Sequence, residues 1–147
     1  MPVSSTLALM NSTQFRTLLA LSIVFGIIGG AIDFLFPSLL AESFWEAQKA
    51  HDESRAQSQT IFFGVAGLAT LVLFFAAAYG LYAFRPWAPR LAALATGAAL
   101  ALAVGAGALA QSGWAIALSH LASYLWGAVL LLAFFSPISE NFKQHEG

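Results

Sequence analysis

Two ionisable side chains, Asp33 and His120, lie inside long apolar stretches of the sequence. Ionisable residues within a membrane span are rare, and those that occur are usually paired with one another or functional. A carboxylate accepts hydrogen bonds, and an imidazole can donate one from a ring nitrogen. The two residue types therefore suit either a structural pair across a helix bundle, or a site for a proton or cation. In the structural alternative, Asp33 is neutralised by His120, or is protonated and bonded to a neighbour.

Asp33 belongs to the segment SIVFGIIGGAIDFLFP, which is rich in small residues and ends in a proline. At helical spacing, Ser22, Gly26, Gly30 and Pro37 share a stripe with Asp33. Pro37 has no amide hydrogen, so the carbonyl of Asp33 is expected to lose its partner within the helix. A free carbonyl and a carboxylate on one residue form an acceptor cluster, which needs a donor, a water or a cation.

The depths of the two groups are expected to match. Asp33 precedes Leu40 by seven residues, and His120 follows Trp114 by six. At about 1.5 Å per residue, both lie roughly 10 Å inside an apolar layer about 30 Å thick. Further polar side chains share the helical face of His120. We therefore predict an intramembrane polar site formed by Asp33, His120, Ser123 and Tyr124.

The composition explains why these residues are placed in a membrane. Of the 147 residues, 59% are hydrophobic and 9% are charged, whereas soluble domains carry about 25% charged residues. The length fits a single domain spanning residues 1–147. A net charge of -1 offers no basic face for nucleic acid. The chain has no cysteine, which excludes disulfides, thiolate metal sites and cysteine nucleophiles.

Four continuous apolar runs are each long enough to cross a bilayer as a helix, which takes about 20 residues. The runs do not alternate as barrel strands would. We predict an all-α integral membrane four-helix bundle, with helices over residues 14–40, 54–84, 87–110 and 114–135. The polar segment of residues 41–60 is expected to form a partly helical outer loop. Asn11 and Gln14 have the spacing of a capping pair for the first helix.

Short connections predict an antiparallel, up-down-up-down arrangement in which the last three helices are successive neighbours. Lys and Arg near span ends favour the cytoplasmic side. This rule places both termini in the cytoplasm, with the tails, and leaves Lys49 and Arg55 outside. The residues that set this topology are Arg16, Arg85, Arg90 and Lys143. The first residues lack the basic segment of a secretory signal, so we expect no cleavable signal.

Small residues recur at four-residue spacing, most regularly at Ala93, Gly97, Ala101 and Gly105. Such stripes let membrane helices approach closely. The partner is expected to be another helix of the same bundle, with a second copy of the chain as the alternative. The glycines expected to mediate helix packing are Gly26, Gly30, Gly64, Gly67, Gly97 and Gly105.

No catalytic residues, metal ligands or cofactors are predicted. The sequence contains no nucleophile elbow, phosphate loop or dinucleotide fingerprint. The acidic residues of the outer segment lack the spacing of a calcium-binding loop. Only one histidine lies in a span, so a bis-histidine haem would require a dimer.

The sequence therefore favours a non-enzymatic structural or accessory membrane subunit. Its expected partners are membrane lipid and either a second copy of the chain or a larger membrane complex. A small transporter coupled to protons or cations, using Asp33 with His120, is the alternative function. The Ala/Gly-rich helices and short loops suggest a bacterial inner membrane.

Overall fold

The structure is a computed structural model that describes residues 11–40, 42, 43, 46, 49, 50, 53, 56–106 and 111–143. These residues are helical or irregular, with no strand among them. In this part of the chain, four helices are long and apolar enough to cross a membrane. No more than 22% of the most apolar window of any of them is buried inside the chain. Because most of their apolar surface has no protein neighbour within the chain, these helices suit a lipid solvent.

The first span, α1, runs over Ser12–Leu35. The predicted cap is confirmed: the amide of Gln14 donates to Oδ1 of Asn11, and the amide of Asn11 donates to Oε1 of Gln14. The helix ends earlier than residue 40, because Pro37 disfavours helical backbone at the residue before it. A short 3-10 helix, η3, then covers Pro37–Leu39. The carbonyl of Asp33 consequently belongs to an ordinary helix end, where the last four carbonyls lack helical partners.

The second and third spans, α3 (Gln57–Tyr82) and α4 (Ala88–Ala106), are joined by a tight turn. Beyond Tyr82, the amide of Phe84 donates to the carbonyl of Leu81, and that of Arg85 to the carbonyl of Gly80. This pair of bonds is the Schellman arrangement, which needs a left-handed residue after the helix. Phe84 supplies it with a φ of 52°, at a position where glycine is usual.

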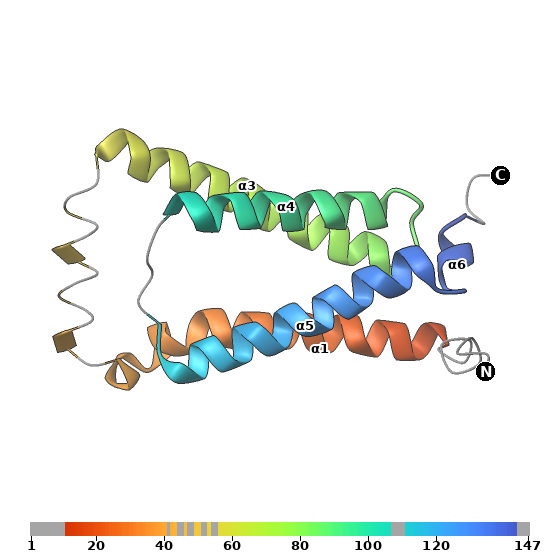
Figure 1. Ribbon diagram of the computed structural model, residues 1–147, viewed down its shortest axis with the longest axis horizontal. Helices are drawn as coiled ribbons and strands as arrows, with labels where there is room; N and C mark the ends of the chain where they lie inside the picture. Colours follow the sequence, from red (N-terminus) through yellow and green to blue (C-terminus); the bar gives the residue numbers. More distant parts are fainter. Residues whose placement is uncertain are drawn as a thin grey trace, which may run out of the picture.

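The last span, α5, covers Gly113–Phe135, and a short helix, α6, follows over Ser139–Lys143. Figure 1 shows two crossed pairs, α1 with α5 and α3 with α4. The helices α4 and α5, expected as neighbours, are in contact, but the most extensive contact of α5 is with α1. Contacts between α4 and α5 are few, although the indole nitrogen of Trp126 donates to Oγ1 of Thr96 across them at 2.8 Å.

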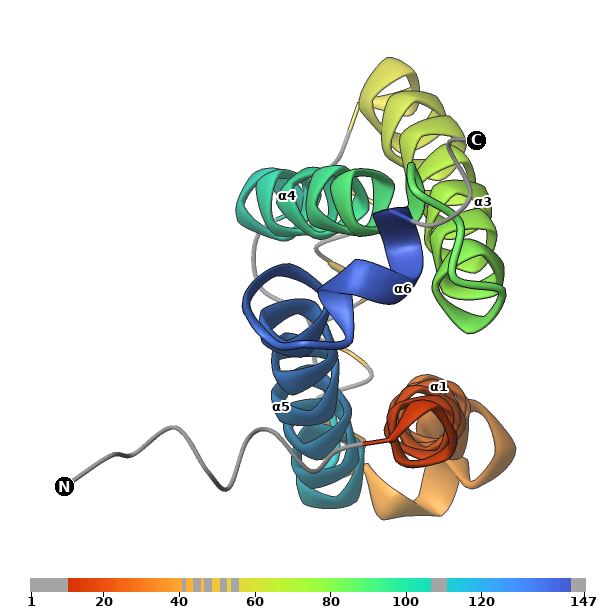
Figure 2. The ribbon, with the colours of Figure 1, turned by 90° about the vertical axis from the view of Figure 1, so that its right-hand side faces the viewer.

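The two helix pairs meet at one end, beside the start of α1, the short helix α6 and the turn between α3 and α4 (Figure 1). Here α6 lies across the end of the bundle (Figure 2). Phe15 of α1 packs between two aromatic rings, with centroids 5.6 Å from Phe84 and 6.0 Å from Phe142. All three rings are buried. The buried hydrophobic cluster of the described residues includes these rings and draws side chains from all four long helices and from α6.

The glycines that permit close approach differ from most of those expected. A Cβ built on Gly105 would meet the ring of Phe63 at 3.2 Å, and one on Gly26 would make ordinary contact with Ala122 at 3.7 Å. Tighter constraints fall on Gly29 and Gly80. At the remaining expected packing glycines, no described residue has an atom within 4 Å of such a Cβ; they are Gly30, Gly64, Gly67 and Gly97.

The predicted outer loop is described only in part. The residues of it that are described before Ala56 have helical backbone, and Nζ of Lys49 lies 4.0 Å from Oε1 of Glu53. Three residues of the predicted loop, His51, Asp52 and Arg55, lie outside the described residues. The end of the third predicted helix, residues 107–110, also lies outside them.

Candidate functional site

The carboxylate of Asp33 is bonded to the start of α5. Its Oδ2 accepts a hydrogen bond from the backbone amide of Ser112 at 2.8 Å. Ser112 is the N-cap of α5, and its own Oγ accepts from the amide of Ala115 at 3.1 Å. Amides at the first turn of a helix have no helical acceptors and carry the positive end of the helix dipole. Asp33 and Ser112 together therefore satisfy two of the amides that begin α5.

The second carboxylate oxygen of Asp33 has no such partner. Oδ1 is buried, and it makes no hydrogen bond with any part of the chain that the structure describes. A buried acceptor without a donor is costly in a medium of low dielectric constant. One oxygen of Asp33 thus has a structural role, while the other has no donor among the described residues.

The structure does not bring His120 to Asp33. His120 is exposed on α5, and its ring makes an edge contact with Tyr124, with centroids 6.2 Å apart. The expected equality of depth depended on a first helix that ended at Leu40. Because α1 ends at Leu35, Asp33 is level with Ser112, eight residues or about 12 Å before His120.

The other two members of the predicted polar site stay near His120 on the surface of α5. Ser123 is exposed, and its hydroxyl donates to the carbonyl of Ser119 at 2.8 Å within the same helix. Tyr124 is 71% exposed. These three residues form a polar patch on one helix and contribute no hydrogen bond to Asp33.

Ser22 and Gly29 hold α1 against α5. The sequence places Ser22 on the stripe of Asp33, whereas Gly29 is not among the expected contact residues. The hydroxyl of Ser22 is buried and donates to the carbonyl of Ala122 at 3.1 Å. At Gly29, a Cβ would stand 2.9 Å from Oγ of Ser119 and 3.0 Å from its amide nitrogen. Ser22, Gly29 and Asp33 are spaced by seven and four residues, so they share one helical face. That spacing is the signal that favours Gly29 over Gly30 as the contact position.

The part of the chain that the structure describes contains no group of three His, Asp or Glu residues placed to hold a metal ion. No protein-family model matches the chain, and no curated protein or solved structure is significantly similar to it.

Proposed function

We propose that the chain is a non-enzymatic structural or accessory subunit of a membrane assembly. The observation that carries the proposal is the bond from the amide of Ser112 to Asp33. It uses the only acidic residue of the four candidate spans to join two helices. An acid that holds the start of a helix has a sufficient structural reason to lie in a span.

The proposed topology is up-down-up-down, with both termini in the cytoplasm of a bacterial inner membrane. Arg85 lies in the turn between α3 and α4, and Arg90 lies in the first turn of α4. Arg16 lies near the start of α1, and Lys143 ends α6. These segments lie at the same end of the bundle in Figure 1. Lys and Arg in short connections favour the cytoplasmic side. A reporter enzyme that is active only in the cytoplasm should therefore be active when it is fused to the C-terminus.

Glycines that are open within the chain support an assembly role. Among the described residues, no atom lies within 4 Å of a Cβ added to Gly64 or Gly67 of α3 or to Gly97 of α4. Small residues on the surface of a membrane helix permit close contact with a further helix. We propose that these faces contact a second copy of the chain or a larger membrane complex.

Leucine substitution tests this surface. Gly97→Leu should leave the fold of the chain intact, because nothing lies near the added side chain, and should reduce the larger species seen by cross-linking in membranes. Ala99→Leu is the matched control, since Ala99 is exposed two residues away on the same helix. A wild-type chain that sediments as a monomer and copurifies with no other membrane protein would contradict the proposal.

A transporter coupled to protons or cations is the second candidate. It is favoured by Oδ1 of Asp33, which accepts no hydrogen bond from the part of the chain that the structure describes. In reconstituted vesicles, a transporter would dissipate an imposed proton or cation gradient. Asp33→Asn would abolish that flux while the protein stays folded, because the amide oxygen still accepts from Ser112. Vesicles that hold their gradient as well as empty ones would exclude this function.

A further inference from the structure

Arg16 of α1 is fixed against the end of α3 by three contacts. Its Nε donates to the backbone carbonyl of Tyr82 at 3.1 Å. Its guanidinium carbon lies 4.8 Å from the centroid of the Tyr82 ring and 5.1 Å from that of Phe84. The carbonyl of Tyr82 is one of those left free where α3 ends, so a cation is favourable there.

These contacts leave most of the hydrogen-bonding capacity of Arg16 unused. A guanidinium has five N–H groups, and the bond to Tyr82 uses one of them. In the part of the chain that the structure describes, no carboxylate forms an ion pair with Arg16. The two terminal nitrogens form the planar fork that matches the oxygens of a phosphate group.

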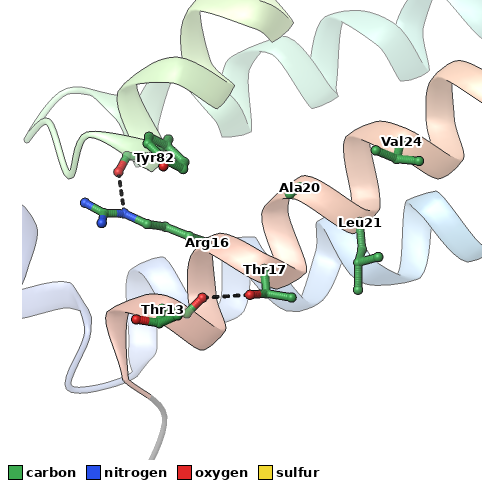
Figure 3. A pocket seen from close by; sticks show the side chains of 7 residues that line it. All are labelled: Thr13, Arg16, Thr17, Ala20, Leu21, Val24 and Tyr82. Carbon is green, nitrogen blue, oxygen red and sulfur yellow. Dashed lines mark hydrogen bonds between the residues drawn. The ribbon is translucent and has the colours of Figure 1, made fainter.

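Arg16 lines a hollow of about 420 Å³ between α1 and the end of α3. Figure 3 shows its side chain reaching from α1 toward the carbonyl of Tyr82. The polar residues at this end of the hollow are Thr13, Arg16, Thr17 and Tyr82. The hydroxyl of Thr17 donates to the carbonyl of Thr13, whereas the hydroxyl of Thr13 has no hydrogen-bond partner among the described residues.

The hollow continues along α1 into the apolar span. Ala20, Leu21 and Val24 line it one to two turns beyond Arg16. A neighbouring hollow of about 490 Å³ shares Thr13 and Thr17, but none of its lining residues is charged. The hollow at Arg16 thus combines a fixed cation, a hydroxyl with no hydrogen-bond partner among residues 11–143 that the structure describes, and an apolar wall that extends toward the bilayer centre.

We propose that this hollow binds an anionic phospholipid. Arg16 and the hydroxyl of Thr13 bind the phosphate, and the apolar wall contacts an acyl chain. Basic pockets between membrane helices are suited to anionic headgroups. A soluble anion would contact only the polar end of the hollow, whereas a phospholipid contacts both the polar end and the apolar wall. The site does not depend on whether the chain acts as a subunit or as a transporter.

Lipid affinity in detergent micelles tests the proposal, with native mass spectrometry of the full chain as the readout. Phosphatidylglycerol, phosphatidylcholine and inorganic phosphate are the three probes. The wild type should bind phosphatidylglycerol more tightly than phosphatidylcholine. Arg16→Gln should weaken phosphatidylglycerol binding by about fivefold, which is the change in affinity expected when one cation near an anionic lipid is removed. Arg90→Gln is its control, since Arg90 is exposed at the same end of the bundle and lies outside the hollow.

A second variant leaves Arg16 in place. Ala20→Phe fills the apolar wall, and Ala20 is exposed, so the fold tolerates the ring. It should also weaken phosphatidylglycerol binding, while Ala99→Phe on α4 should not. If Arg16→Gln fails to fold, Ala20→Phe decides the question. Equal binding of the two lipids, unchanged binding by Ala20→Phe, or inorganic phosphate that competes fully with the lipid would each overturn the proposal.

Discussion

Gly29 of α1 packs directly on Ser119 of α5, so that a Cβ at position 29 would stand 3.0 Å from the amide nitrogen of Ser119. Backbone cannot move aside as a flexible side chain does. This contact, together with the bond from Ser22 to the carbonyl of Ala122, sets the distance between the two helices.

Alanine at position 29 should therefore destabilise the protein, although alanine is the better helix former. Overpacking of this kind costs about 1–3 kcal/mol. Gly30→Ala is the neighbouring control, because an added Cβ there meets nothing within 4 Å, and it should stabilise the helix by up to about 1 kcal/mol. Unfolding in mixed detergent micelles measures both. Equal effects of the two substitutions would mean that α1 and α5 are not in close contact.

The bond between Asp33 and Ser112 predicts that, at position 33, an acceptor oxygen contributes more to the stability of the fold than a negative charge does. Asp33→Leu leaves the amide of Ser112 without an acceptor, at a cost of about 1–3 kcal/mol. Asp33→Asn keeps the acceptor and loses the favourable interaction of a charge with the helix dipole, which is worth about 0.3–1 kcal/mol. The same unfolding measurement separates the two. A larger loss with asparagine than with leucine would contradict this assignment.

The hydrogen bond from Trp126 to Thr96 should couple α4 to α5. The hydroxyl of Thr96 already donates to the carbonyl of Ala92, which orients its oxygen toward the indole. A double-mutant cycle with Thr96→Val and Trp126→Phe should give a coupling energy of about 0.6 kcal/mol, the average for such bonds in a membrane. Additive effects of the two substitutions would show that the bond does not form.

The left-handed backbone of Phe84 predicts an unusual ranking of substitutions. Its ring packs on Phe15 and Phe142, so Phe84→Ala should cost about 3–5 kcal/mol. Phe84→Gly loses the same ring but also relieves the strain of a φ of 52°. Glycine should therefore be better tolerated than alanine, by about 1 kcal/mol. Thermal unfolding of the two variants checks this order; a more stable alanine variant would mean that position 84 is not left-handed.

The sequence predicts the spans well because length and apolar continuity depend on local composition alone. It also predicts the cap formed by Asn11 and Gln14, since both residues lie within one turn. Pro37 predicts the end of α1, because the residue before a proline avoids helical backbone. A helix that ends at Leu40 instead puts Asp33 deeper in the apolar layer, at the level of His120.

Other features depend on contacts between distant segments. The association of α1 with α5 follows from Ser22 and Gly29 fitting Ser119 and Ala122, whereas loop length alone favoured α4 as the neighbour of α5. The left-handed backbone of Phe84 has no local signal, because its position would ordinarily be glycine. It is compatible with phenylalanine only because rings from α1 and α6 surround it.

The pairing of α1 with α5 also imposes an order on biosynthesis. Asp33 and Ser112 are 79 residues apart, and a ribosome adding about 5–20 residues per second needs roughly 4–16 s to cover that distance. During this interval α1 enters the bilayer before its main helical neighbour has been translated. The insertion machinery must therefore hold or release a helix whose buried serine and carboxylate have no partners yet. Slow release of α1 from the translocon, measured by site-specific cross-linking of nascent chains, is the expected consequence.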